Sequence, residues 1–213
     1  MENEILELKD LYDTIIEDIR NRLEDFRSGF LKMNNDSLFA ELCFCTLTPQ
    51  SKAKSCWKSV EHLRDTGLLY RAGKETLSRS ITGVRFHNNK SAYIEANRRL
   101  FYSMDFKRFI LENISDVRKL RKWLVTNIKG YSFKEAGHFL RNIGYGSEIA
   151  ILDRHILKNM VIYGVISEIP KSINERTYLE LERKLLEFSK KTRIPPDHLD
   201  ILFWYKQTGE IFK

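Results

Sequence analysis

The stretch Asn127–Asn159, NIKGYSFKEAGHFLRNIGYGSEIAILDRHILKN, sets the architecture of this chain. Apolar residues recur at helical spacing on both sides of a short turn that contains Gly130. Ser132 and Glu135 form an S-x-x-E capping box, which predicts that the second helix begins at the turn. We therefore expect residues 127–143 to form a helix-hairpin-helix, whose outward-facing N–H groups suit a phosphate.

Two residues of this stretch are candidates for chemistry. Lys134 falls in the first turn of the second helix, where the helix dipole disfavours a cation. That position suits an amine that must lose its proton. Asp153 follows nineteen positions later and is predicted to cap the next helix. Lys129 and Arg154 flank the turn and the cap, so we expect both to contact phosphate.

The runs KGYSFKEAGHFLRNIGY (129–145) and AILDRHIL (150–157) resemble the helix-hairpin-helix DNA glycosylase superfamily, most closely its type-2 8-oxoguanine DNA glycosylase/lyases of archaea and bacteria. The resemblance extends from about Leu38 to the C-terminus. It implies that Lys134 is the nucleophile and Asp153 the essential carboxylate. The family hairpin usually reads G-x-G-x-K, whereas this chain has Ser132 at the second glycine.

The same resemblance implies further site residues. Gln50, between two helices, would fill the gap left by a flipped nucleotide, and Gly130 and Ser132 would contact the DNA backbone. Phe86 and Trp204 would stack on the excised base, and the terminal Lys213 would contact it. For Gln50 the alternative is an ordinary turn. For Phe86 it is a side chain that fills the core.

No strand-like alternation is present, so the predicted fold is all-α. The resemblance implies that the helices form two lobes, with the hairpin at the cleft between them. Residues 36–126 are expected to form a middle bundle. Residues 1–35 and 127–213 are expected to form the second lobe. The N-terminal region up to Phe30 is predicted to be one amphipathic helix or two. A further helix is predicted from Leu38 to Thr46, capped by Asp36 or Ser37.

Composition limits the class of protein. The net charge of +7 suits a polyanionic partner without proving one. Three cysteines, Cys43, Cys45 and Cys56, suit buried thiols in a reducing compartment rather than disulfides or a zinc site. No cysteine follows Asp153, which excludes the iron–sulfur loop of some relatives. With no apolar run long enough to span a membrane, we expect a cytoplasmic, nucleoid-associated protein.

The expected function is excision of 8-oxoguanine from double-stranded DNA, followed by β-elimination at the abasic site through a lysine Schiff base. We expect a monomer that needs no cofactor and no metal ion for catalysis, with a monovalent cation at the hairpin as an open question. Two alternatives remain at this stage. One is a related glycosylase/lyase for oxidised pyrimidines, and the other is a DNA-binding module without enzymatic activity.

Overall fold

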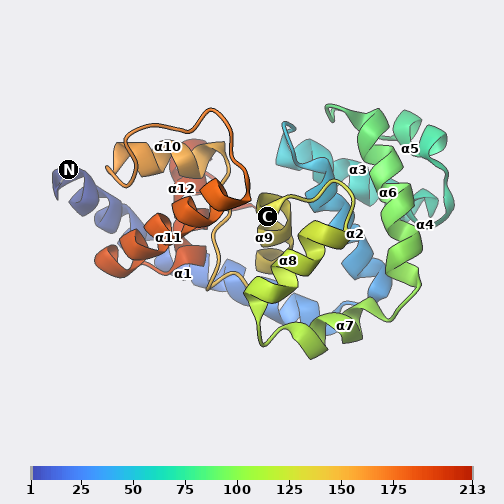
Figure 1. Cartoon of the computed structure of the whole chain (residues 1–213), viewed down its shortest axis with the longest axis horizontal. Helices are drawn as coiled ribbons and strands as arrows, with labels where there is room; N and C mark the ends of the chain where they lie inside the picture. The colour runs from blue at the N-terminus through green and yellow to red at the C-terminus, as the bar shows by residue number, and fades with distance from the viewer. Residues whose placement is uncertain (1, 213) are drawn as a thin grey trace. The chain divides into compact units, whose positions relative to one another are not determined.

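The computed structural model describes residues 2–212, and these residues form an all-α fold with no strand, as predicted (Figure 1). The helices are α1 (Glu2–Lys32), α2 (Asn35–Leu47), α3 (Ala53–Asp65), α4 (Leu68–Arg71), α5 (Lys74–Ser80), α6 (His87–Tyr102), α7 (Phe106–Asn113), α8 (Val117–Asn127), α9 (Phe133–Asn142), α10 (Arg154–Ile162), α11 (Glu175–Thr192) and α12 (Pro196–Thr208).

The chain divides into two compact units. A middle unit comprises residues 30–139, and a second unit, here called the terminal unit, comprises residues 1–29 and 140–213. The boundaries differ from the predicted 36–126 and 1–35 plus 127–213, because the hairpin and most of α9 group with the middle unit. Contacts with α2 and α6 account for this: the Tyr131 hydroxyl donates to the Leu42 carbonyl, and Asn97 bonds the backbone of Lys129.

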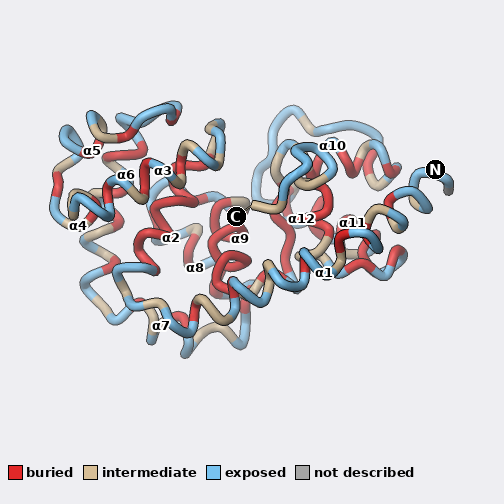
Figure 2. The backbone as a smooth tube through the Cα atoms, turned by 180° about the vertical axis from the view of Figure 1, so that it is seen from behind, coloured by how far each residue is buried: buried red, intermediate tan, exposed pale blue. Residues whose placement is uncertain are grey.

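Helix α2 forms the centre of the middle unit, and α3, α6 and α7 pack against it. Every residue from Leu38 to Leu47 is buried, as the red tube in Figure 2 shows. A helix that is apolar on all sides is stable only when neighbours surround it. Its N-cap is Asn34, whose side chain accepts from the Ser37 N–H, rather than the predicted Asp36 or Ser37.

The N-terminal region is a single helix, α1, which settles the choice between one helix and two. Within the terminal unit its buried positions include Leu8, Ile15, Ile19 and Phe26, which lie on one face at helical spacing. The other end of α1 lies in the middle unit. There the Lys107 ammonium donates to the carbonyls of Leu31 and Met33, at 2.9 and 2.6 Å.

In the terminal unit, α10 and α11 pack against α12. Buried side chains of α11 hold the segment that leads into α10. The Tyr178 hydroxyl donates to the Ala150 carbonyl at 2.7 Å, and the Glu182 carboxylate accepts from the Ala150 N–H at 2.8 Å. A buried ion pair, Arg141 to Asp200 at 3.2 Å, joins α9 to α12. The backbone is therefore fixed close to Asp153.

Cys43, Cys45 and Cys56 are buried free thiols, as predicted. Burial raises the pKa of Cys56 to about 11, so its thiol is protonated at neutral pH. Among the described residues, no helix is long and apolar enough to cross a membrane.

Candidate DNA-binding and catalytic site

The hairpin begins where α8 ends. The Tyr131 N–H donates to the Ile128 carbonyl at 3.2 Å, which closes the turn, and Gly130 takes a left-handed φ of +82°. A Cβ atom at Gly130 would lie 2.5 Å from the ring of Tyr93 on α6. Glycine is required here for two reasons, the backbone conformation and the close approach of a neighbouring helix.

Ser132 caps α9, as the capping box predicts. The Glu135 carboxylate accepts from both the N–H and the hydroxyl of Ser132, and the Ser132 hydroxyl accepts from the Lys134 N–H at 3.3 Å. Ser132 does not have a positive φ. A serine at the second glycine of the family hairpin is therefore compatible with this turn and gives the helix a cap.

The side chain of Asn97 on α6 forms hydrogen bonds with the backbone of the hairpin. Its amide nitrogen donates to the Lys129 carbonyl at 3.0 Å, and its oxygen accepts from the Lys129 N–H at 2.7 Å. Three of the four amides from Lys129 to Ser132 thus bond within the protein. Among the described residues, the Gly130 N–H is the hairpin amide left for an external acceptor.

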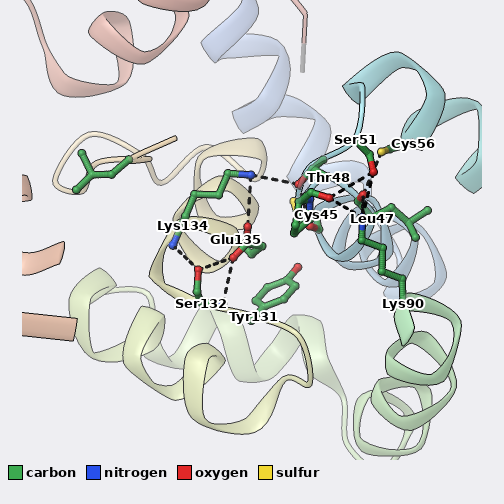
Figure 3. A network of polar contacts seen from close by, with 12 residues as sticks. Cys45, Leu47, Thr48, Ser51, Cys56, Lys90, Tyr131, Ser132, Lys134 and Glu135 are labelled. Atoms are coloured by element: carbon green, nitrogen blue, oxygen red, sulfur yellow. Dashed lines mark hydrogen bonds and ion pairs between the residues drawn. The ribbon is translucent and has the colours of Figure 1, made fainter. Parts of the chain in front are cut away.

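Lys134 lies on the first turn of α9 (Figure 3), and its side chain is 20% exposed. The Lys134 Nζ atom is 3.3 Å from the hydroxyl of Thr48 and 3.4 Å from Oε1 of Glu135. The Thr48 hydroxyl donates its own proton to the Cys45 carbonyl at 2.9 Å, so toward Lys134 it acts as an acceptor. The amine is therefore oriented by two oxygens and still reaches solvent.

Gln50 lies in the turn between α2 and α3. It is exposed and has a φ of 55°, in the left-handed region. Such a conformation in a residue other than glycine costs on the order of 1 kcal/mol and persists only when neighbouring contacts fix it.

Phe86 precedes α6 with a similar φ of 58°, and the residue is 53% exposed. It does not fill the core, which excludes the alternative considered for it. The Arg85 guanidinium lies 5.4 Å from the centre of its ring.

In the terminal unit, Asp153 caps α10, as predicted. Its Oδ1 atom accepts from the N–H groups of His155 and Ile156 at 2.7 and 2.8 Å. Both bonds reach the same oxygen, so Oδ2 takes no part in capping. Arg154, the first residue of α10, is exposed.

Trp204 on α12 packs edge-on against the ring of His155, with ring centres 5.3 Å apart. Beyond α12 the chain turns at Gly209, which has a φ of 69°. The tail then lines a pocket of about 320 Å³ in the terminal unit, formed by Asp18, Asn21, Arg22, Asp25, Tyr205 and Ile211. The predicted base contact at Lys213 lies outside the described residues.

The structure brings together the part of the predicted site that belongs to the middle unit. The Nζ atom of Lys134 contacts the hydroxyl of Thr48, which lies beside the turn that carries Gln50. Asp153, Arg154 and Trp204 belong to the terminal unit. Among the described residues, no group of three or more His, Cys, Asp or Glu side chains is arranged to hold a metal ion.

Sequence reasoning missed four residues that shape the site: Thr48, Lys90, Tyr93 and Asn97. Lys90 and Asn97 share one face of α6 with the buried Ile94 and Phe101. Their spacing of seven positions, in phase with apolar residues, was the available signal. Polar residues on a buried helix face need partners.

The family model described as 8-oxoguanine DNA glycosylase matches residues 19–194. An 8-oxoguanine DNA glycosylase/AP lyase of Fusobacterium nucleatum is 40% identical over 209 residues, covering 97% of this chain and 96% of that protein. The corresponding protein of Methanocaldococcus jannaschii is 36% identical over 211 residues, covering 98% and 99%.

Two solved structures agree with this likeness. The 8-oxoguanine DNA glycosylase of Thermotoga maritima superimposes with a TM-score of 0.88 at 30% identity, covering all of both chains. The M. jannaschii 8-oxoguanine glycosylase/lyase, in complex with a 15mer DNA containing 8-oxoguanine, gives a TM-score of 0.88 at 34% identity, covering 98% of this chain and 99% of that chain. With its hairpin, a lysine on the first turn of the capped helix α9 and a family match over most of its length, this chain belongs to the 8-oxoguanine DNA glycosylase family.

Proposed function

We propose that this protein excises 8-oxoguanine from double-stranded DNA and then cleaves the strand at the abasic site, with Lys134 as the nucleophile and Asp153 as the carboxylate that assists it. The observation that carries the proposal is the position of Lys134 at a capped hairpin, oriented by Thr48 and Glu135 and still open to solvent. Relatives named 8-oxoguanine DNA glycosylase/AP lyase, matched over nearly their whole length, support it.

The proposed chemistry proceeds in two stages. The neutral Lys134 amine attacks C1′ of the everted nucleotide, and the C1′–N9 bond breaks as the base leaves with the bonding electrons and a proton. The sugar ring opens to give a Schiff base between C1′ and Nζ. Loss of a 2′ proton then expels the 3′ phosphate, and water releases the lysine. Neither stage requires a metal ion or a redox cofactor.

Asp153 would stabilise the positive charge that develops on the sugar. Because capping uses only Oδ1, the Oδ2 atom is available for this role. Phe86, Trp204 and Lys213 remain the proposed contacts to the base, and the exposure of Phe86 suits stacking.

The Gly130 N–H, with the side chains of Lys129 and Arg154, would contact the DNA backbone. Ser132 enters this proposal as the cap of α9, since both of its hydrogen-bond donors are directed to Glu135. Since the proposed substrate is chromosomal DNA, we also propose that the protein acts in the cytoplasm at the nucleoid, as a monomer.

Borohydride reduction tests the nucleophile. The protein is incubated with duplexes that carry 8-oxoguanine opposite each normal base, and with duplexes that carry an oxidised pyrimidine. We expect wild type to form a covalent adduct with the 8-oxoguanine duplexes. Lys134→Gln should form none and should excise the base at least about 10³-fold more slowly.

Lys158→Gln serves as a matched control, because Lys158 is an exposed lysine on α10, in the terminal unit. It should retain both the adduct and the excision rate. An adduct in Lys134→Gln, or none in wild type, would refute the proposed nucleophile. Adducts confined to the oxidised-pyrimidine duplexes would instead refute the proposed substrate.

A further inference from the structure

The ammonium group of Lys90 is buried at the end of α2 and makes three hydrogen bonds there (Figure 3). It donates to the Leu47 carbonyl at 2.7 Å, to the Pro49 carbonyl at 2.6 Å and to the Ser51 hydroxyl at 3.1 Å. All three donors of the ammonium are therefore used. The last carbonyls of a helix lack partners within the helix, so Lys90 on α6 caps the C-terminus of α2 from outside.

Two of these hydrogen bonds restrain the chain on both sides of Gln50, at Pro49 and at Ser51. The Ser51 hydroxyl also accepts from the Arg85 N–H at 3.0 Å, which ties the turn to the residue before Phe86. Gln50 itself has the left-handed φ of 55°. A strained residue of this kind keeps its conformation only where the flanking backbone is fixed, and Lys90 supplies that restraint.

Burial of a lysine ammonium group costs free energy. Burial lowers the pKa of Lys90, and the nearby cations Lys134 and Arg85 lower it further, whereas Cys56 and Glu135 oppose the shift. An apolar side chain of similar size would avoid this cost, but it would remove the hydrogen bonds that the ammonium donates to the carbonyls of Leu47 and Pro49. The ammonium is therefore explained by the bonds that hold this turn and not by the filling of space.

We propose that Lys90 is a positioning residue, which fixes the turn from Leu47 to Ser51 so that the side chain of Gln50 is presented to the DNA duplex. The inference rests on the proposed function, in which Gln50 fills the gap left by the everted nucleotide. Lys90 itself does not touch the DNA in this account. It acts through the backbone of the turn.

The test compares two substrates. In one duplex 8-oxoguanine pairs with cytosine, and in the other it faces an abasic-site analogue and has no partner. Extrusion of an unpaired base costs less, so a defect in the residue that fills the gap affects mainly the paired substrate. We expect Lys90→Met to slow excision of the paired lesion about tenfold and of the unpaired lesion by less than about threefold. Gln50→Gly should show the same selectivity.

Double substitution tests whether Lys90 acts through Gln50. Lys90→Met combined with Gln50→Gly should be no slower than Gln50→Gly alone. If Lys90 acts only through Gln50, the effects of the two substitutions on the excision rate do not add. Lys107→Met is the matched control, since the Lys107 ammonium caps the end of α1 through two carbonyls in the same way. It should leave the paired-to-unpaired ratio of rates unchanged.

Thermal unfolding checks that each variant is folded. If Lys90→Met does not fold, Ser51→Ala removes one of the Lys90 bonds and the Arg85 bond without burying a new charge, and it carries the same expectation.

Equal loss on both substrates, or effects of Lys90→Met and Gln50→Gly that simply add, would overturn the inference. Wild type inactive on both duplexes would refute the proposed function, whereas an unchanged ratio in an active variant would refute only the role of Lys90.

Discussion

The Oδ1 atom of Asp153 caps α10, and its Oδ2 atom takes no part in capping, so the proposed role in catalysis falls to Oδ2. Asparagine caps a helix about as well as aspartate. We therefore expect Asp153→Asn to change the free energy of unfolding by less than about 0.5 kcal/mol and to leave the affinity for lesion DNA nearly unchanged. Single-turnover excision should slow on the order of 10²-fold.

Asp116→Asn provides the comparison for Asp153→Asn. Asp116 caps α8 in the middle unit through its Oδ1 atom, which accepts from the Lys119 N–H at 2.9 Å. We expect this variant to excise at the wild-type rate. A near-normal rate for Asp153→Asn as well would reduce Asp153 to a helix cap.

The residues that sequence predicts best are those whose role is local. The capping box at Ser132 and the N-cap at Asp153 each need only a few neighbouring residues, and the structure confirms both. Lys90 and Asn97 escaped prediction because their partners lie more than thirty positions away in the chain. The left-handed backbone of Gln50 and Phe86 could not be predicted either, since it depends on such distant contacts.

At the scale of elements, α6 presents Lys90, Tyr93 and Asn97 along its length, and these side chains support the α2–α3 turn and the hairpin. The sequence of this segment shows helical periodicity but not what the helix supports. Helical periodicity reports which face of a helix is buried. It does not report which neighbour covers that face.

The approach of Tyr93 to the hairpin leads to a prediction for Gly130→Ala. Gly130 has a φ of +82°, and a Cβ atom there meets the Tyr93 ring at 2.5 Å, so backbone strain and steric overlap both oppose alanine. We expect the substitution to lower the free energy of unfolding of the protein by about 2–3 kcal/mol in urea denaturation. Adding Tyr93→Ala should relieve the overlap and leave the backbone strain.

Gly209→Ala separates the two contributions to the cost of Gly130→Ala. Gly209 has a φ of +69°, but a Cβ atom there would have no neighbour within 4 Å. This variant should lose only the strain component, about 1 kcal/mol. Equal losses for Gly130→Ala and Gly209→Ala would mean that Tyr93 does not constrain the hairpin.

At the scale of the whole molecule, the two residues proposed for catalysis belong to different units, Lys134 to the middle unit and Asp153 to the terminal unit. Their separation of nineteen positions in sequence says nothing about this division. The predicted boundary, between residues 126 and 127, placed the hairpin turn and its second helix with Asp153 and left the preceding helix in the middle bundle. Contacts of the hairpin with α2 and α6, which no local pattern reveals, place it in the middle unit instead.

The net charge of +7 belongs to the whole molecule, and it does not by itself identify which cations meet the DNA. Lys129 is exposed, and its backbone is held at both ends by Asn97, so its side chain starts from a fixed point. If it contacts phosphate, Lys129→Gln should weaken binding equally for damaged and undamaged duplexes. The negative slope of log K against log salt concentration should become shallower by about 0.9. Lys190→Gln, an exposed cation on α11, should leave the slope unchanged. A loss confined to the damaged duplex would instead assign Lys129 to recognition of the lesion.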